Sequence, residues 1–165
     1  MKYRAAVLTV SDRGYAGQRP DESGPQLEKD LAASGLGFTV VARRVVPDER
    51  ERIAAALTAW ADEGISLILT TGGTGFSPRD VTPEATTAVI ERPAPGFTEA
   101  MRQESRKITP HAMISRAVAG IRRGSLIINL PGSVKAAREC LAVVLPALPH
   151  ALDKLAGDPT DCGRG

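Results

Sequence analysis

The chain has few aromatic residues, no long apolar run and almost no excess of one charge. Its 165 residues include one Trp, two Tyr and three Phe, which disfavours a platform of aromatic rings that stacks nucleic-acid bases. The formal net charge is only +2, with acidic and basic residues interleaved, so nucleic-acid binding has little electrostatic support. No apolar stretch approaches the roughly 18 residues of a membrane span, and the run at 1–11 is too short for a secretory signal.

Cysteine is equally scarce. Cys140 and Cys162 are the two cysteines of the chain, and neither has the CxxC or Cys/His spacing of a zinc site. Cys140 lies in an apolar helical run, which favours a packed thiol over a functional one. We therefore expect a protein of the reducing cytoplasm, with no structural zinc.

Strand-like and helix-like segments alternate along the whole chain. Short runs rich in Val, Leu and Ile predict strands at 4–10, 38–46, 65–70 and 125–130, with a strand or turn at 117–121. Helical periodicity predicts helices at 23–33, 49–61, 97–107 and 134–155, and a further helix from residue 82; Pro146 and Pro149 divide the last of them. Asp48 and Thr82 are placed to cap two of these helices.

This alternation predicts one α/β domain: a three-layer α/β/α sandwich whose sheet is mostly parallel and is covered on both faces. We assign the domain to 1–156 and a flexible tail to 157–165. In such sheets, ligands bind beyond the carboxyl ends of the strands. Polar and glycine-rich residues gather at four of these ends, which indicates one composite site: Ser11-Asp12, Pro47-Asp48, the loop at 70–80, and Pro131-Gly132-Ser133.

The loop Thr71-Gly72-Gly73-Thr74-Gly75 is the strongest element of that site. Its glycines let an anion approach the main chain, and its threonines add hydroxyl donors. The loop lacks the Gly-Lys-Ser/Thr of a P-loop and the spacing of a dinucleotide fingerprint. Taken alone, it is equally compatible with a tight connection between a strand and a helix, and Asp80 with a residue that only flanks a helix start.

The string TTGGTGFSPRDVTPEAT at 70–86 resembles the signature of the molybdopterin-adenylylating family, which includes bacterial cofactor-assembly proteins and the G domain of gephyrin. Further segments resemble motifs of that family in the same order: LTVSD (8–12), SGP (23–25), VVPDE (45–49), PGF (95–97), MRQES (101–105), KITPHAMISR (107–116), AGIR (119–122) and INLPGS (128–133). The resemblance covers nearly the whole chain. One departure is Val134, where members of the family usually have proline.

The resemblance implies the fold of molybdenum cofactor biosynthesis proteins, and a reaction in which the terminal phosphate of molybdopterin attacks the α-phosphate of ATP. The products are adenylyl-molybdopterin and pyrophosphate, and Mg²⁺ is the expected metal. Asp80 and Asp48 match aspartates regarded as functional in the family, so they are the predicted catalytic and metal-binding residues. The predicted residues that bind substrate are Ser11, Asp12, Thr71, Gly72, Gly73, Thr74, Gly75, Pro131, Gly132 and Ser133.

Several alternatives stay open. Arg79, Arg116 and Lys135 are candidate phosphate partners but are equally compatible with solvated surface charges, whereas His111 and His150 are interpreted as structural. A binding protein of the same fold, which holds molybdopterin without transferring AMP, is the second functional hypothesis. The resemblance further implies a homotrimer and a downstream partner that inserts molybdate.

Overall fold

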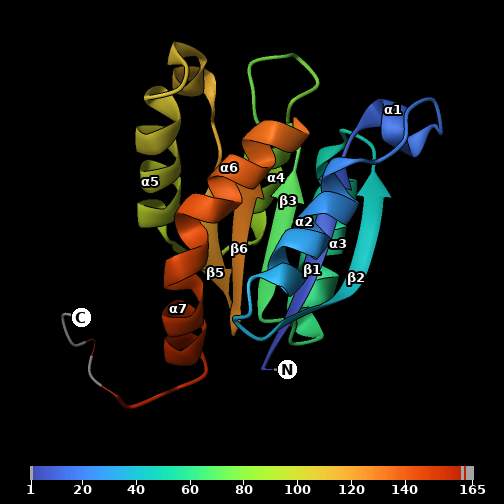
Figure 1. The fold of residues 1–165 in the computed structure, drawn as a ribbon. Coiled ribbons are helices and arrows are strands. Elements are labelled where there is room, and N and C mark those ends of the chain that lie inside the picture. The colour runs from blue at the N-terminus through green and yellow to red at the C-terminus, as the bar shows by residue number, and fades with distance from the viewer. Residues whose placement is uncertain (1, 161, 163–165) are drawn as a thin grey trace.

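A six-stranded sheet with helices on both faces forms the centre of the computed structural model, which describes residues 2–160 and 162 (Figure 1). The strand order is β2-β1-β3-β6-β5-β4. The strands are β1 (Tyr3–Val10), β2 (Phe38–Val46), β3 (Leu67–Thr71), β4 (Arg92–Pro93), β5 (Ala119–Arg122) and β6 (Ser125–Leu130). The predicted three-layer, mostly parallel architecture is confirmed.

Four neighbouring strands are parallel and end at one edge of the sheet. β1 pairs in parallel with β2 and β3, and β3 pairs in parallel with β6. Because Thr71 lies opposite both Thr9 and Leu130, the loops that follow β1, β3 and β6 begin side by side. β5 and β4 extend the sheet in antiparallel pairing beyond β6.

The helices divide between the two faces of the sheet (Figure 1). One face is covered by α2 (Ser23–Ala33), α5 (Pro95–Arg106), α6 (Val134–Val144) and α7 (Leu148–Leu155), and the other by α3 (Arg50–Asp62) and α4 (Thr82–Val89). The alternation of β1 explains this division, because Ala5 and Val7 enter one buried cluster while Ala6 and Leu8 enter the other. Both clusters fix the sheet that carries the loops.

Two predicted helix caps are wrong. Glu49 is the N-cap of α3, and the carboxylate of Asp48 accepts the backbone N–H of Asp12 instead. Val81 is the N-cap of α4, while the buried hydroxyl of Thr82 donates to the Gly72 carbonyl at 3.0 Å. In both cases the side chain that the local pattern assigned to the helix end forms a hydrogen bond with a residue distant in sequence.

The remaining elements refine the prediction. The closing helix is divided as expected, with the short 3₁₀ turn η2 (Leu145–Ala147) between α6 and α7. Three short elements were not predicted: α1 (Asp12–Tyr15), the 3₁₀ turn η1 (Pro110–Ile114) and the two-residue strand β4. In the described part of the chain, no helix has the length and apolarity that crossing a bilayer requires. Of the predicted tail at 157–165, residues 161 and 163–165 lie outside the described residues.

Candidate functional site

The glycine loop after β3 is in direct contact with the loop after β6. Gly72 and Gly73 have φ values of +100° and +68°, which side chains rarely adopt. A Cβ at Gly72 would collide with the carbonyl oxygen of Val10, and one at Gly132 would lie 3.2 Å from the Gly72 Cα. The Gly72 N–H donates to the Leu130 carbonyl at 3.1 Å, and the Thr71 hydroxyl donates to the Pro131 carbonyl at 2.7 Å. The main chains of the two loops therefore approach closely, as the composite site requires.

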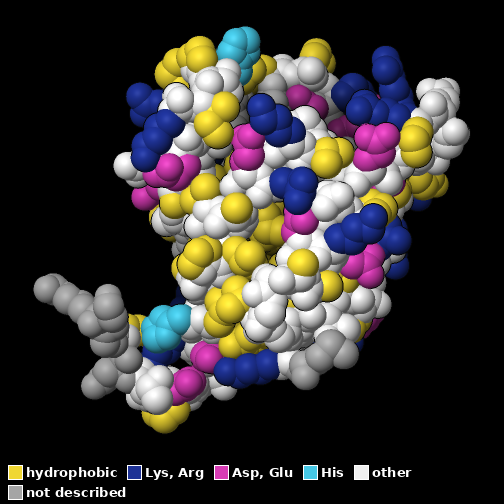
Figure 2. All heavy atoms as spheres, viewed as in Figure 1, with side chains coloured by type: hydrophobic (Ala, Val, Ile, Leu, Met, Phe, Trp, Pro, Cys, Tyr) yellow, Lys and Arg dark blue, Asp and Glu magenta, His cyan; other side chains and the backbone are white. Residues whose placement is uncertain are grey.

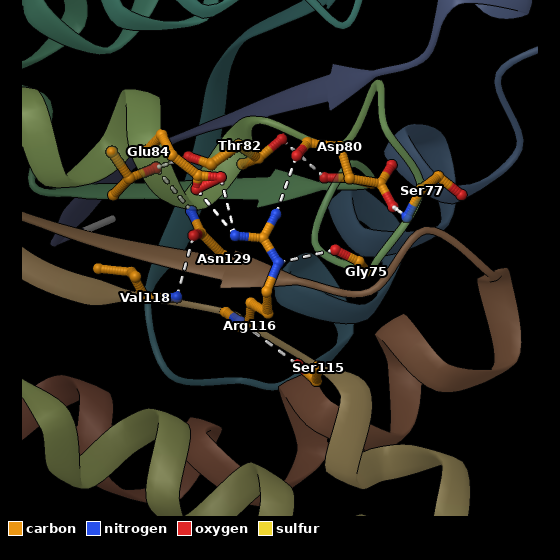
Figure 3. A network of polar contacts seen from close by, with 12 residues as sticks. Gly75, Ser77, Asp80, Thr82, Glu84, Ser115, Arg116, Val118 and Asn129 are labelled. Carbon is orange, nitrogen blue, oxygen red and sulfur yellow. Dashed lines mark hydrogen bonds and ion pairs between the residues drawn. The ribbon is translucent and has the colours of Figure 1, made fainter.

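Arg116 fixes the second half of the glycine loop (Figure 3). Its Nε donates to the Gly75 carbonyl at 2.8 Å, and its Nη2 donates to the Asp80 carbonyl at 2.9 Å. Its Nη1 lies 2.8 and 2.9 Å from the two carboxylate oxygens of Glu84 on α4. The guanidinium thus joins both ends of the 75–80 segment to a helix. Arg116 holds the loop in shape, which differs from both alternatives that the sequence left open, a phosphate partner and a solvated surface charge.

Asn129, which is also drawn in Figure 3, connects neighbouring strands and a helix next to the start of the glycine loop. Its amide donates to the hydroxyls of Thr70 and Thr86 at 3.0 and 2.9 Å, and its oxygen accepts the Val118 N–H at 3.0 Å. Asn129 is fully buried, so these bonds satisfy a polar group that would otherwise destabilise the core. The loop therefore stands on a rigid base.

Asp12 and Asp48 clamp the ends of β1 and β2 together. The Asp12 N–H donates to Asp48 Oδ2, and the Asp48 N–H donates to Asp12 Oδ1, each at 2.9 Å. Arg79 closes the arrangement, because its Nε and Nη2 donate to both oxygens of Asp12 at 3.0 and 2.9 Å. Both oxygens of Asp12 are thus engaged by protein groups. Asp12 positions Asp48, and Arg79 is committed to Asp12.

The pKa values of Asp12 and Asp48 are shifted in opposite directions. The hydrogen bonds from Arg79 lower the pKa of Asp12 below its ordinary value. Burial raises the pKa of Asp48, and the negative charges of Asp12 and Asp80 raise it further, against the lowering effect of the Asp12 N–H. The environment of Asp48 therefore favours a cation beside it. A positive charge would offset the cost of burying the carboxylate and the repulsion from Asp12 and Asp80.

Asp80 and Asp48 flank the glycine loop on two sides. A Cβ at Gly75 would lie 3.0 Å from Asp80 Oδ2, and one at Gly73 would lie 3.0 Å from Asp48 Oδ1. Asp80 Oδ2 accepts the Ser77 N–H at 3.0 Å, and Asp80 Oδ1 has no hydrogen bond within the described residues. Each carboxylate thus keeps an oxygen for a ligand while its other oxygen is held by the backbone.

Two cavities meet at this loop. The first, here called the α5 cavity, has a volume of about 390 Å³ and extends over α5 and η1. The second, here called the α2 cavity, has a volume of about 370 Å³ and lies between the loop and the start of α2. Gly73, Asp80 and Gly132 line both cavities, so they form the border between them.

The structure places nearly all of the predicted site residues on these cavities. The α2 cavity is lined by Ser11, Asp48, Thr71, Gly72 and Ser133, and the α5 cavity by Thr74, Gly75 and Pro131. Asp12 lines neither, since it is turned to Asp48 and Arg79. Ser11 and Ser133 also act as N-caps, because they accept the backbone N–H groups of Gly14 and Ala136. Lys135 lines neither cavity; its nearest charge partner is Glu139, 3.9 Å away.

Sequence reasoning missed several residues that line the cavities. The α5 cavity includes Arg102, Ser105 and His111, and the α2 cavity includes Arg19 and Asp21. Arg102, Ser105 and His111 lie in the segments MRQES and KITPHAMISR. The resemblance of these segments to family motifs could have indicated that α5 and η1 contribute to the site. Cys140 is buried as predicted, and it also lines the α5 cavity, where burial raises the pKa of its thiol.

Asp48 and Asp80 suit Mg²⁺ in the manner of a metal that is bound together with a phosphate substrate. Mg²⁺ prefers oxygen ligands and is commonly held by one or two carboxylates plus substrate phosphates. Among the residues that the structure describes, no cluster of three His, Cys, Asp or Glu side chains forms a complete metal cage. The nearby third acid, Asp12, is saturated by Arg79 and Asp48. The pair therefore fits a metal whose coordination the substrate completes.

Comparison with known sequences gives a consistent result. Residues 6–150 match the family described as "Probable molybdopterin binding domain". The chain is 45% identical over 153 residues to a protein of Helicobacter pylori named molybdopterin adenylyltransferase, covering 92% of this chain and 87% of that protein. It is 50% identical over 161 residues to gephyrin of Dictyostelium discoideum, where the match covers 93% of this chain but only 22% of the relative.

A solved structure agrees with these relatives. A molybdopterin biosynthesis enzyme from Thermus thermophilus superimposes with a TM-score of 0.88 at 49% sequence identity. The superposition covers 96% of this chain and 99% of the other. The likeness therefore extends over the whole sheet and both helical layers.

Proposed function

Because the chain belongs to this family of molybdopterin-binding domains, we propose that it is a molybdopterin adenylyltransferase. It transfers AMP from ATP to the terminal phosphate of molybdopterin. An oxygen of that phosphate bonds to the α-phosphorus of ATP, the bond from this phosphorus to the β-phosphate breaks, and pyrophosphate leaves. The naming of the Helicobacter pylori relative, which this chain covers to 87% of its length, supports the reaction.

The observation that carries the proposal is the border of the two cavities. Two substrates must bring their phosphates to one point, and Gly73, Asp80 and Gly132 are common to both cavities. Gly73 and Gly132 have no side chain of their own, so phosphate oxygens can approach the main chain at this border. Holding two reacting anions in line supplies much of the rate of such a reaction.

The charge of the α2 cavity supports a requirement for a divalent metal. Its lining includes the acidic residues Asp21, Glu22, Asp48 and Asp80, so a bare triphosphate meets negative charge there. Basic and acidic side chains also lie next to one another on the surface near α1 (Figure 2). In the proposed site, Asp48 and Asp80 hold Mg²⁺, which when bound neutralises charge on the phosphates. The protein's own residues bind, orient and shield the reacting groups.

The test is direct assay of the purified chain. Molybdopterin, ATP and Mg²⁺ are expected to give adenylyl-molybdopterin and one equivalent of pyrophosphate, both measured by chromatography. Asp80→Asn is the matched inactive control: it removes the charge while an amide oxygen can still accept the Ser77 N–H. We expect a loss of about 100-fold or more in kcat, the size seen when a charge-stabilising group is removed. Retention of molybdopterin without any nucleotide product would favour the non-catalytic binding protein.

Three wider expectations accompany the proposal and rest on the family resemblance. We propose that the chain acts in the cytoplasm, as a homotrimer, and passes its product to a molybdate-inserting protein. The match to 22% of gephyrin supports the last point, because it places a similar domain within a longer chain. Light scattering is expected to give three times the 17.4 kDa chain mass, and a monomeric mass would contradict the trimer.

A further inference from the structure

The α2 cavity contains one basic side chain among several acids. Arg19 is the single Lys or Arg among the residues that line it, whereas Asp21, Glu22, Asp48 and Asp80 are acidic. An anionic ligand that enters this cavity therefore meets one cationic group of the protein, and that group lies in the 16–22 segment between α1 and α2. Local sequence pattern offers no reason to select Arg19 over the other arginines.

Other basic side chains near the site are already committed. Arg79 binds both oxygens of Asp12, and Arg116 binds Glu84 and two loop carbonyls. In the α5 cavity, Nη1 of Arg102 donates to the carbonyls of Ser115 and Ala117. A phosphate would have to displace a protein partner from Arg79 or Arg116 in order to bind there.

The guanidinium of Arg19 is uncommitted. Across residues 2–160 and 162, no hydrogen bond or ion pair engages it. The chain just after it is tethered, because Asp21 accepts the Thr9 hydroxyl at 2.9 Å and the Gly24 N–H at 3.0 Å. Pro20 further restricts the backbone between the two residues. Arg19 is thus held at the cavity by a fixed neighbour while its charged end remains available.

We propose that Arg19 binds the β- and γ-phosphates of ATP and the pyrophosphate that leaves. This inference rests on the proposed adenylyl transfer. The reacting α-phosphate belongs at the shared border of Gly73, Asp80 and Gly132, and Arg19 lines the α2 cavity alone. A guanidinium donates two parallel hydrogen bonds to phosphate oxygens, which suits the part of the nucleotide that gains charge as the bond to the α-phosphorus breaks. Arg19 takes part in no covalent step.

The experiment measures binding of pyrophosphate and of AMP separately, each with Mg²⁺, by calorimetry on the full chain. Arg19→Ala is expected to weaken pyrophosphate binding by about 10- to 100-fold, the range for losing charged hydrogen bonds, and AMP binding by less than about 2-fold. Arg19→Lys is expected to restore part of the affinity, since it keeps the charge but not the fork. Arg13→Ala is the matched control, because Arg13 is an exposed arginine on the adjacent α1 that lines neither cavity.

Each other outcome overturns the inference. Unchanged pyrophosphate affinity in Arg19→Ala would remove Arg19 from the site, and an equal loss of AMP affinity would place it at the α-phosphate or the nucleoside. An equal loss of pyrophosphate affinity in Arg13→Ala would mean that the effect comes from the net charge of the surface and not from a specific contact. The assay of adenylyl transfer separates the two proposals. If the wild-type chain forms product and Arg19→Ala binds pyrophosphate as tightly as the wild type, the proposed function stands and this inference fails. A wild-type chain that binds neither ligand loses both.

Discussion

At the scale of single residues, Asp48 has two separable roles, one through its charge and one through its hydrogen bond to Asp12. Asp48→Asn removes the charge, while its amide oxygen can still accept the Asp12 N–H. Asp48→Ala removes both. If Asp48 helps to hold the metal, both variants should raise the Mg²⁺ concentration for half-maximal rate by about tenfold or more, the equivalent of roughly 1.5–3 kcal/mol for a charged interaction.

Stability separates the two variants. Only Asp48→Ala should lower the free energy of unfolding, by about 1–3 kcal/mol, because it leaves the part-buried Asp12 N–H without its partner. Magnesium titrations of the rate, with thermal unfolding in parallel, measure both effects. Wild-type magnesium dependence in both variants would leave Asp48 with the clamp alone, and full activity in excess chelator would refute a metal-dependent reaction.

Gly73 and Gly75 differ in what a methyl group would meet. At Gly73 the φ of +68° and a collision with the Thr82 hydroxyl both oppose a side chain, so Gly73→Ala should cost about 1–3 kcal/mol of folding free energy. Gly75 has no positive φ, and its Cβ would lie 3.0 Å from the end of the Asp80 side chain. Gly75→Ala should therefore preserve stability and weaken nucleotide binding. Thermal melts with and without MgATP test the pair, and equal stability losses in both variants would contradict this distinction.

At the scale of elements, the segment 75–80 depends on Arg116 for its attachment to α4. Arg116→Lys keeps the charge near Glu84 but loses the fork that reaches the carbonyls of Gly75 and Asp80. We expect kcat to fall by roughly 10- to 100-fold, since misplacing a reacting group by about an ångström has an effect of this size. Arg138→Lys is the control, because Arg138 makes a similar forked pair with Asp30 away from both cavities. Equal rates in the two variants would show that the loop does not need Arg116.

The sequence predicted the bounds of elements well where turn or break residues lie at both ends of a segment. The predicted bounds of α2, β2 and β6 coincide with the structure, because turn or break residues bracket each segment. The four-residue α1 and the turn η1 were missed, since their residues lack an apolar period and each depends on a local cap, from Ser11 and Thr109 respectively. Periodicity detects elements that pack on the core and passes over short ones at its edge.

The sequence predicted which loops lie together at the site, but not the hydrogen bonds between their side chains. Strand-end loops lie side by side in a parallel sheet, and the structure brings Asp48, Asp80 and the two glycine loops together around the two cavities. The pairing of Asp12 with Asp48, 36 residues away, and with Arg79, 67 residues away, has no local signal. For the same reason the sequence analysis left Arg79 and Arg116 as either phosphate partners or solvated charges, and it did not select Arg19.

At the scale of the whole molecule, the site is inseparable from the fold. Its loops leave β1, β2, β3 and β6, which lie side by side in the centre and at one edge of the sheet (Figure 1). Buried clusters on both faces fix these strands, and α2 and α6 begin at the α2 cavity. Disruption of either cluster should therefore also disrupt the cavities, because the strands that carry the loops of the site pack into both clusters.

This dependence predicts that a nucleotide stabilises the chain as one unit. A ligand that binds only the folded state at about 100 times its Kd adds roughly 2.7 kcal/mol to the free energy of unfolding. For a chain of this length, each kcal/mol raises Tm by about 2–4 °C, so saturating MgATP should raise Tm by about 5–11 °C. Calorimetric scans at fixed protein concentration should show one transition that moves without broadening. Asp80→Asn should move less, because it lacks a charge at the border of the cavities. A second transition, insensitive to nucleotide, would instead mean that part of the sheet unfolds independently of the site.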